Sequence, residues 1–543
     1  MFEVGRDIFK HGSNDVHAPN ASKVRMSIVL GIFCVLFVLF VVKTLYLGFM
    51  GSDENRVRGS GDWNVDRADI VDRNGNDILA KNISSCDVAL VPSRLSDKDK
   101  DRAAELIHQL LPYKYSLTDA LTLVYNTTRY KPLAKNIPDE QCKPLRAARI
   151  DGLDVKRVQM RKYPKHRLFS HVVGFVGDDG HGLEGAESIF DDYLTENMDP
   201  LRLSLDTRIQ MAFYEQLSLA MQKYDAKGAM GMLMNSRTGE MLAMVSLPDF
   251  DPENIQIDPL SNHLFKPLRG VFEMGSIFKI FNTAMAMENH INKKYVINKP
   301  FPILDKNGRV AKYVTDVASF KPKTPTMSVE EIMLHSCNVG SAQIALEFPD
   351  GTQKEFFHRL HLDEKLDLEF GKTEKPLMPR KWGPVERATL SYGHGISVTP
   401  MHLLLAVNAM TNGGIYIYPT LQKRSIGAVR GERVLDPEIS ARLREIMFGV
   451  VEETSGRNAR VPGFRIGGKT GTAEKYASGT NDKKRNQTAF VGIFPVDAPQ
   501  YILLVILDEP KGIKETWNLR TSAWNAVPTA GKIMSRILPL LFE

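Results

Sequence analysis

The stretch GVFEMGSIFKIFNTAMAME, residues 270–288, decides the fold because it sets a serine one helical turn ahead of a lysine. Gly275 ends an extended run, and apolar residues then recur at helical spacing. Ser276 and Lys279 therefore share one face of a predicted helix, with Cβ atoms roughly 5–6 Å apart.

The apolar neighbours of Lys279 suggest a reason for this pairing. A serine hydroxyl is a poor nucleophile unless a base takes its proton, and an ordinary lysine, with a pKa of about 10.4, is protonated. Burial lowers that pKa and can leave Lys279 as a neutral amine beside Ser276, at the positive end of the helix. For this tetrapeptide alone, however, a surface position on an amphipathic helix is the better explanation.

A second polar cluster follows downstream. Ser328 and Glu331 form a capping box that predicts a helix start, and the triplet Ser336-Cys-Asn338 precedes another helical run over residues 339–346. Ser336 could relay a proton and Asn338 could hold a substrate amide. Taken alone, the triplet is better explained as an ordinary turn between helices.

A third cluster lies near the C-terminus, where residues 464–468 lead into Lys469-Thr-Gly-Thr472 with an edge-strand pattern. Gly471 is expected to let a ligand backbone approach the strand. Lys469 supplies a cation, and Thr470 and Thr472 supply hydroxyls suited to a carboxylate. Lys469 is also expected to lower the pKa of Lys279 by like-charge repulsion.

The surrounding patterns predict an α+β fold, in which one antiparallel sheet is covered by helices. The supporting segments are a buried hairpin over residues 228–245, two strands over 488–494 and 501–507, and a closing helix over 527–541. Residues 53–200 instead mix short strands, such as 69–72 and 88–91, with loops. Their basic tract, 129–167, is interpreted as a solvated face, with anionic lipid or glycan as the less favoured partner.

Residues 171–182 imitate a dinucleotide-binding motif. Residues 171–177 are typical of a strand, Gly180-His-Gly182-Leu-Glu-Gly185 matches G-x-G-x-x-G, and Asp206 follows. The acidic residues around these glycines would repel a pyrophosphate. The glycines are therefore interpreted as turn positions.

Composition further limits the class of protein to which the chain can belong. A chain of 543 residues with 43% apolar content can bury a large core, and a net charge of +6 does not argue for nucleic acid. The four cysteines show no C-x-x-C spacing, so a metal site is not expected. Cys86 and Cys142 could form a disulfide or remain as two thiols.

The N-terminal region predicts a membrane anchor over residues 26–49. Residues 26–42 carry no charge, and Lys43 can extend its amine to the interface. Basic residues before the segment would keep residues 1–25 in the cytoplasm. The alternative, a cleaved signal peptide, lacks a suitable cleavage site.

S-x-x-K, S-x-N and K-T-G occur in this order along the chain, and the pattern resembles the penicillin-recognising serine transpeptidases. Further segments resemble landmarks of class B penicillin-binding proteins: RADIVDRNG (67–75), RKYP (161–164), GLEGAE (182–187) and SYGHGISVTP (391–400). The resemblance runs from the anchor to the C-terminus. It is strongest to the septal D,D-transpeptidases of cell division in Gram-negative bacteria.

The resemblance implies a five-stranded antiparallel sheet in a transpeptidase domain over residues 204–543. A mainly β or mixed pedestal of the dimerisation type would precede it over residues 50–203. The implied reaction is acylation of Ser276 by the penultimate D-Ala of a pentapeptide stem, with Lys279 as the base. An amine from a neighbouring stem then resolves the acyl-enzyme.

The same resemblance assigns the remaining roles. Ser336 and Lys469 would shuttle the proton, Asn338 would bind the stem amide, and Thr470 and Thr472 would bind the terminal carboxylate. The backbone N–H groups of Ser276 and Thr472 would form the oxyanion hole. Penicillin and other β-lactams would acylate Ser276, and no cofactor, metal or nucleic acid is implied.

The implied location is the inner membrane at the division septum, with a single span and a periplasmic catalytic domain. The implied partners are a polytopic SEDS-family glycan polymerase and other division membrane proteins. The alternatives are an elongation-specific transpeptidase, a catalytically silent scaffold, and a β-lactam sensor or hydrolase.

Four residues depart from the family pattern. Met274 and Ile277 stand where Pro and Thr are usual, Cys337 where Ser is common, and Ala68 where Gly is usual. Cys337 is interpreted as a packing residue.

Overall fold

The structure, a computed structural model, describes residues 30–41, 43, 67–305, 307–317, 320–424, 427, 429, 431–477 and 480–542. It separates into two units, residues 1–63 and 64–543, which are considered individually. Residues 30–41 are helical. No helix among the described residues combines the length and the apolar character that a membrane span requires. The predicted anchor lies partly outside the described residues, so it stays a prediction.

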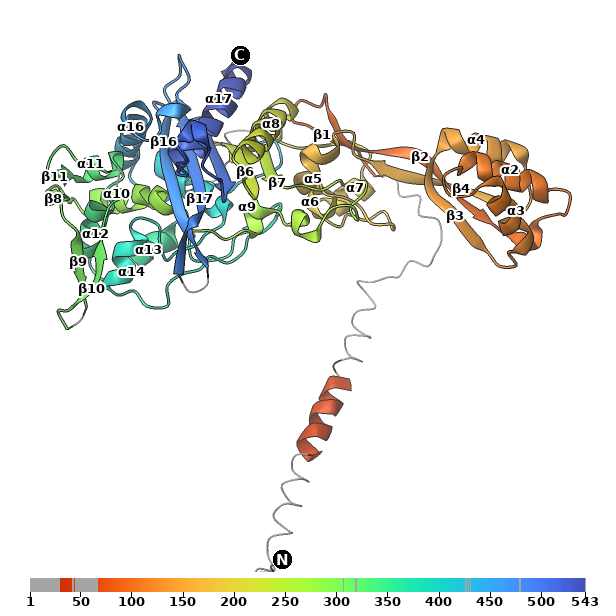
Figure 1. The fold of residues 1–543 in the computed structure, drawn as a ribbon, viewed down its shortest axis with the longest axis horizontal. Helices are drawn as coiled ribbons and strands as arrows, with labels where there is room; N and C mark the ends of the chain where they lie inside the picture. The colour runs from red at the N-terminus through yellow and green to blue at the C-terminus, as the bar shows by residue number, and fades with distance from the viewer. Residues whose placement is uncertain are drawn as a thin grey trace, which may run out of the picture. The chain divides into compact units, whose positions relative to one another are not determined.

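The larger unit contains a five-stranded antiparallel sheet, as the sequence predicts (Figure 1). Its strands, in spatial order, are β16 (Gly467–Ala477), β17 (Thr480–Phe494), β18 (Tyr501–Asp508), β6 (Gly228–Asn235) and β7 (Met241–Leu247). The predicted hairpin is thus confirmed as β6 and β7, and the two predicted C-terminal strands as β17 and β18. The strand that carries Lys469 forms one edge of the sheet.

Side chains alternate between the two faces of this sheet and divide its core into two layers. In β18, Ile502, Leu504 and Ile506 pack into one cluster, whereas Leu503 and Val505 pack into the other. This alternation is the period of two expected for a strand. The second layer is covered by α8 (Thr207–Lys223) and α17 (Ala526–Phe542), and α17 confirms the predicted closing helix.

The main helices that cover the first layer include those next to the S-x-x-K and S-x-N motifs. They are α10 (Lys279–Glu288), α11 (Val329–Leu334), α12 (Asn338–Glu347), α15 (Pro400–Thr411) and α16 (Pro437–Glu453). Ser328 caps α11 through the predicted capping box with Glu331. Helix α16 packs along the edge strand β16.

Residues 67–203 form a second sheet, here called the pedestal sheet. Its strands are β1 (Ile70–Val71), β2 (Ile78–Leu90), β3 (Lys131–Pro138), β4 (Leu153–Lys162) and β5 (Leu201–Arg202). Three helices share a small separate core with it: α2 (Lys100–Leu110), α3 (Leu117–Asn126) and α4 (Asp139–Ala148). The structure joins Cys86 of β2 to Cys142 of α4 in a disulfide, with Cα atoms 6.5 Å apart.

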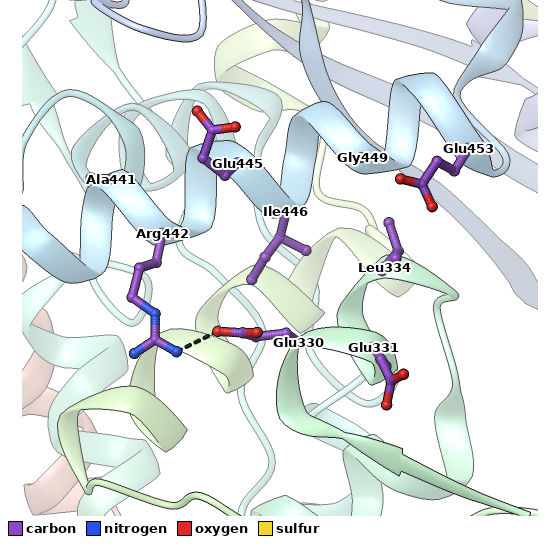
Figure 2. A pocket seen from close by; sticks show the side chains of 9 residues that line it. All are labelled: Glu330, Glu331, Leu334, Ala441, Arg442, Glu445, Ile446, Gly449 and Glu453. Atoms are coloured by element: carbon purple, nitrogen blue, oxygen red, sulfur yellow. Dashed lines mark hydrogen bonds and ion pairs between the residues drawn. The ribbon is translucent and has the colours of Figure 1, made fainter. Parts of the chain in front are cut away.

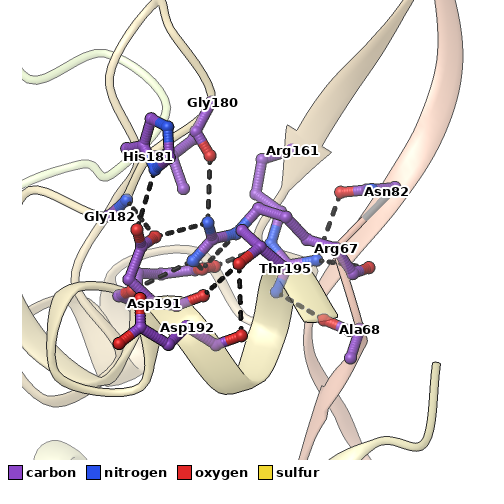
Figure 3. A network of polar contacts seen from close by, with 12 residues as sticks. Arg67, Ala68, Asn82, Arg161, Gly180, His181, Gly182, Asp191, Asp192 and Thr195 are labelled. Carbon is purple, nitrogen blue, oxygen red and sulfur yellow. Dashed lines mark hydrogen bonds and ion pairs between the residues drawn. The ribbon is translucent and has the colours of Figure 1, made fainter. Parts of the chain in front are cut away.

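Three of the landmark segments meet in one buried ionic network (Figure 3). Arg67 Nη2 and Arg161 Nε donate to opposite oxygens of Glu187, at 2.9 and 2.7 Å. All three side chains are at most 2% exposed. Asp191 adds a further ion pair to Arg67 at 2.6 Å. The network connects the chain before β1 with the end of β4 and with α6 (Gly185–Ile189) and α7 (Asp191–Glu196).

The strand predicted over residues 171–177 is wrong. The structure has a short helix there, α5 (Ser170–Val173), which ends at Gly174. Its valines are buried on the helix, and a short apolar run has the same appearance in a buried helix as in a strand. Gly180 and Gly185 have positive φ angles of 79° and 62°, in agreement with their interpretation as turn positions.

The remaining elements are small and complete the helical layers. They are α9 (Lys266–Arg269), α13 (Thr352–Arg359), α14 (Pro384–Leu390) and the strand pairs β8 (Lys294–Val296) with β11 (Thr326–Ser328), β9 (Phe301–Leu304) with β10 (Val310–Val314), β12 (Asp367–Leu368) with β13 (Gly371–Lys372), and β14 (Ile415–Tyr416) with β15 (Glu432–Arg433).

Candidate active site

Ser276 lies in a single 3-10 turn, Gly275–Phe278, which continues directly into α10 at Lys279. The Lys279 amine donates to Ser276 Oγ at 2.7 Å and to Asn338 Oδ1 at 2.7 Å. The Lys279 side chain is 1% exposed and the neighbouring Ile277 and Phe278 are equally buried. The predicted pairing of serine and lysine on one helix face is therefore present.

Burial lowers the pKa of Lys279 from its ordinary 10.5 to about 7. The negative charges of Asp316 and of an ionised Cys337 would oppose part of this shift. At neutral pH a large fraction of the Lys279 amine is therefore uncharged. It can accept the Ser276 proton, because a base works best when its pKa lies near the working pH.

The expected effect of Lys469 on Lys279 is not found. Burial lowers the pKa of Lys469 well below its ordinary value, and the repulsion from Lys279 adds to that lowering. The lowered pKa of Lys279 has burial as its cause and no contribution from Lys469, so the like-charge effect is found at Lys469 instead.

Ser336 and Asn338 come from the turn between α11 and α12. Ser336 has a φ of +60°, which is unusual for a residue other than glycine. Its hydroxyl accepts a hydrogen bond from Lys469 Nζ at 2.9 Å. Because Asn338 contacts Lys279, this turn reaches both lysines of the site. The predicted residues of S-x-x-K, S-x-N and K-T-G thus lie in one cluster.

The two remaining K-T-G side chains lie farther along β16. Thr470 is 8% exposed, and its hydroxyl lies 2.9 Å from Ser455 Oγ. Thr472 Oγ1 accepts a hydrogen bond from the Ser522 backbone N–H at 3.1 Å.

Gly471 also lies against the segment that carries Ser276. A Cβ atom at this position would lie 2.4 Å from the carbonyl oxygen of Met274. In the same way, a Cβ at Gly275 would lie 2.5 Å from the carbonyl oxygen of Thr472. These glycines let the Ser276 segment and β16 approach each other closely. The approach of a ligand backbone to Gly471 stays a prediction.

Sequence reasoning missed Asp316, which follows β10. Its carboxylate accepts hydrogen bonds from the Asn338 backbone N–H and from the Cys337 thiol, the latter at 3.2 Å. Asp316 belongs to none of the motifs and lies in a polar segment, so no sequence signal distinguishes it. It fixes the S-x-N turn and contributes negative charge near Lys279.

Tyr392 and Cys337 complete the surroundings of the lysine. The Tyr392 ring lies with its centroid 5.7 Å from Lys279 Nζ, and Tyr392 belongs to a landmark segment that the sequence analysis had singled out without assigning it a role. Cys337 is fully buried, its pKa is raised to about 12 by burial, and its Sγ accepts from the Gly340 N–H at 3.3 Å. The buried neutral thiol fits the packing role predicted for it.

Across the described residues, no group of three or more His, Cys, Asp or Glu side chains is placed to hold a metal ion.

Comparisons with known proteins cover most of the chain. Residues 229–535 match the family model "Penicillin binding protein transpeptidase domain", and residues 63–197 match "Penicillin-binding Protein dimerisation domain". The chain is 31% identical to "Probable peptidoglycan D,D-transpeptidase FtsI" of Caulobacter vibrioides, over 96% of this chain and 89% of that protein.

Other relatives point the same way. The chain is 27% identical to "Peptidoglycan D,D-transpeptidase FtsI" of Escherichia coli strain K12, over 71% of this chain and 69% of that protein. Its fold is similar to the solved transpeptidase domain of Burkholderia pseudomallei penicillin-binding protein 3, with a TM-score of 0.54 and 28% identity, over 63% of this chain and 96% of that domain. The chain therefore belongs to the penicillin-binding protein transpeptidase family and is a class B member similar to FtsI.

Proposed function

We propose that this protein is a peptidoglycan D,D-transpeptidase that cross-links stem peptides during septal cell-wall synthesis. The observation that carries this proposal is the buried Lys279 amine, which lies 2.7 Å from Ser276 Oγ and has a pKa of about 7. Family membership and the names of the relatives support the substrate class. No observation favours an elongation enzyme, a silent scaffold or a β-lactam sensor.

Acylation begins when Lys279 takes the hydroxyl proton and Ser276 Oγ attacks the carbonyl carbon of the penultimate D-Ala. The tetrahedral intermediate places its negative oxygen at the backbone N–H groups of Ser276 and Thr472, where one donor typically lowers the barrier by about 3 kcal/mol. The C–N bond then breaks, and the amine of the last D-Ala leaves with a proton delivered along Lys469 and Ser336. The 2.9 Å contact between these two supports this route.

Deacylation runs these proton transfers in reverse with a new amine. The amine of a neighbouring stem attacks the Ser276 ester and gives a proton through Ser336 to Lys469, and Lys279 returns its proton to Ser276 Oγ as the C–O bond breaks. A new peptide bond forms and the enzyme is restored.

Substrate binding uses the remaining groups of the cluster. Asn338 binds the stem amide, and Thr470 and Thr472 bind the terminal carboxylate together with Lys469. Burial lowers the pKa of Lys469 and so disfavours its charged form. An incoming carboxylate favours the charged form of a nearby amine, so substrate binding is expected to draw a proton onto Lys469.

The organisation and location of the chain follow from the same family. We assign residues 1–25 to the cytoplasm, 26–49 to a single inner-membrane anchor, 50–203 to the pedestal and 204–543 to the periplasmic transpeptidase domain. The proposed place of action is the division septum. The anchor and the pedestal would contact a SEDS-family glycan polymerase and other division membrane proteins.

Mass spectrometry of the full-length protein in detergent, after treatment with penicillin, tests the proposal. We expect one covalent adduct on the peptide that contains Ser276, and none on the Ser276→Ala variant. Slow loss of the adduct would separate a transpeptidase from a hydrolase. An unmodified Ser276 in folded protein at saturating penicillin would contradict the proposed function.

A further inference from the structure

Two neighbouring hydroxyl residues at the end of α16 contact two elements of the active site, α11 and β16. Thr454 Oγ1 donates to the carbonyl oxygen of Leu334, in α11, at 3.1 Å and shares this proton with the carbonyl oxygen of Val450, in its own helix, at 3.2 Å. Ser455 Oγ lies in hydrogen-bond distance of Thr470 Oγ1, in β16, at 2.9 Å. Residues 454 and 455, here called the clasp, thus connect the helix that leads to Ser336 with the strand that carries Lys469. Neither belongs to a motif that the sequence analysis identified.

The clasp lies where α11 and α16 come together (Figure 2). At one end of the pair, Arg442 of α16 forms an ion pair with Glu330 of α11. At the other end, Leu334 lies near Glu453, the residue before Thr454. A cavity of about 520 Å³, lined by side chains of both helices, lies between them. Polar contacts at the two ends of the pair connect α11 and α16 across this cavity.

Thr454 contacts the carbonyl group of Leu334, which has no hydrogen-bond donor within α11. Leu334 is the last residue of α11, and the hydrogen bonds that close this helix use the carbonyl groups of Glu331, Ile332 and Met333. The last carbonyl groups of a helix need outside donors. Two residues later the chain turns through the positive φ of Ser336, whose hydroxyl meets Lys469. A displaced Leu334 would therefore displace Ser336.

Ser455 contacts the second of these elements, the strand β16. Thr470 is 8% exposed, and the structure places the Ser455 hydroxyl 2.9 Å from its own. A hydroxyl rotates freely until a partner fixes its direction. When Ser455 donates to Thr470, the Thr470 proton is free to donate to the carboxylate of the stem.

We propose that Thr454 and Ser455 are positioning residues with separate effects on acylation, an inference that rests on the proposed acyl transfer at Ser276. Thr454 acts through Leu334 and Ser336 on the proton-transfer step. Ser455 acts through Thr470 on the binding of the carboxylate. Neither residue touches the reacting atoms.

Acylation kinetics with a fluorescent penicillin, on the full-length protein in detergent, separate these effects. The concentration dependence of the rate gives a dissociation constant and a limiting rate. Ser455→Ala is expected to raise the dissociation constant about fivefold to tenfold, as for one neutral hydrogen bond, with the limiting rate unchanged within about twofold. Ser455→Thr, which keeps the hydroxyl, is expected to restore wild-type binding.

Thr454→Val is expected to change the limiting rate and not the dissociation constant. Valine has the shape of threonine but leaves the Leu334 carbonyl without a donor. The limiting rate should fall about tenfold or more, because small displacements of reacting groups are costly, while the dissociation constant changes within about twofold. Thr454→Ser should restore the rate. If the valine variant does not fold, the pair Ser455→Ala and Ser455→Thr decides the proposal.

Ser535→Ala is the matched control, because the Ser535 hydroxyl donates only to Gly531 of its own helix, at 2.8 Å. It should behave as wild type. Wild-type kinetics in both Ser455→Ala and Thr454→Val would overturn the proposed role of the clasp. Equal losses in the dissociation constant and the limiting rate would overturn it as well. Absence of an adduct at Ser276 in the wild type would instead refute the proposed function, so the two failures are distinguishable.

Discussion

At the scale of single residues, the central feature is a lysine that burial deprives of its charge. The pKa of Lys279 is lowered to about 7 in the folded protein, whereas the unfolded chain keeps the ordinary 10.5. Between these values the unfolded state binds more protons than the folded state. The contribution of Lys279 to stability therefore becomes more favourable as the pH rises from about 7 towards 10.5.

Replacement of Lys279 by methionine separates its chemical role from its structural role. Lys279→Met keeps the volume and removes the base, so we expect acylation by penicillin to fall about 10²- to 10⁴-fold. We also expect thermal stability at pH 7 to be retained, because the buried ammonium is gone. Acylation rates and melting curves measured in parallel provide the check. Near-normal acylation in this variant would exclude Lys279 as the base.

Asp316 provides a second prediction at this scale. Its negative charge raises the pKa of Lys279, so Asp316→Asn should lower that pKa further. The midpoint of the rise in acylation rate with pH should therefore move to lower pH. The asparagine side chain still has an oxygen that can accept from the Asn338 N–H. An unchanged midpoint, measured over pH 5 to 9, would contradict this electrostatic role.

Local patterns explain how much of the site the sequence could predict. Ser276 and Lys279 are brought together by a single helical turn, and the capping box of Ser328 and Glu331 spans the same short distance, so both follow from sequence spacing. Asp316 and Ser455 meet their partners only through the packing of separate elements. Nothing in their neighbouring sequence indicates those partners.

At the scale of elements, β6, β7, β18 and the second half of β17 were predictable because they are apolar runs, whereas α5 was mistaken for a strand. The valines next to His171 are buried, and burial alone does not distinguish a short helix from a strand. The lowered pKa values of Lys279 and Lys469 belong to this scale too, because the packing of α10 and β16 buries both side chains.

The disulfide between β2 and α4 gives a prediction for an element pair. It closes a loop over a sequence separation of 56 residues, which restricts the unfolded chain by about 4 kcal/mol in the chain-entropy estimate. Cys86→Ser should therefore destabilise the small core of the pedestal by several kcal/mol. Penicillin acylation should persist, because Ser276 and Lys279 lie in another core layer.

Urea unfolding, followed with and without a reducing agent, tests this expectation. The reducing agent should destabilise the wild type and have no effect on Cys86→Ser. Equal unfolding midpoints for the two proteins without reducing agent would contradict a stabilising disulfide.

At the scale of the whole molecule, the ionic network of Arg67, Arg161 and Glu187 connects segments that are far apart in the sequence. The sequence analysis identified these segments only as separate landmarks. Their common role became visible only in the fold, where one buried carboxylate faces two guanidinium groups. Loss of one partner from such a buried cluster leaves uncompensated charge, which typically costs about 3–5 kcal/mol.

Glu187→Gln should therefore destabilise the protein by about 3–5 kcal/mol, because two buried arginines lose their shared counter-charge. The matched control is Asp178→Asn, which breaks the exposed pair between Asp178 and Lys135. That change should cost less than about 1 kcal/mol. Chemical denaturation of both variants measures the difference, and limited proteolysis should show faster cleavage between β4 and α6 in Glu187→Gln alone. Equal stability of the two variants would show that the arginines find other partners and that the network does not hold the pedestal segments together.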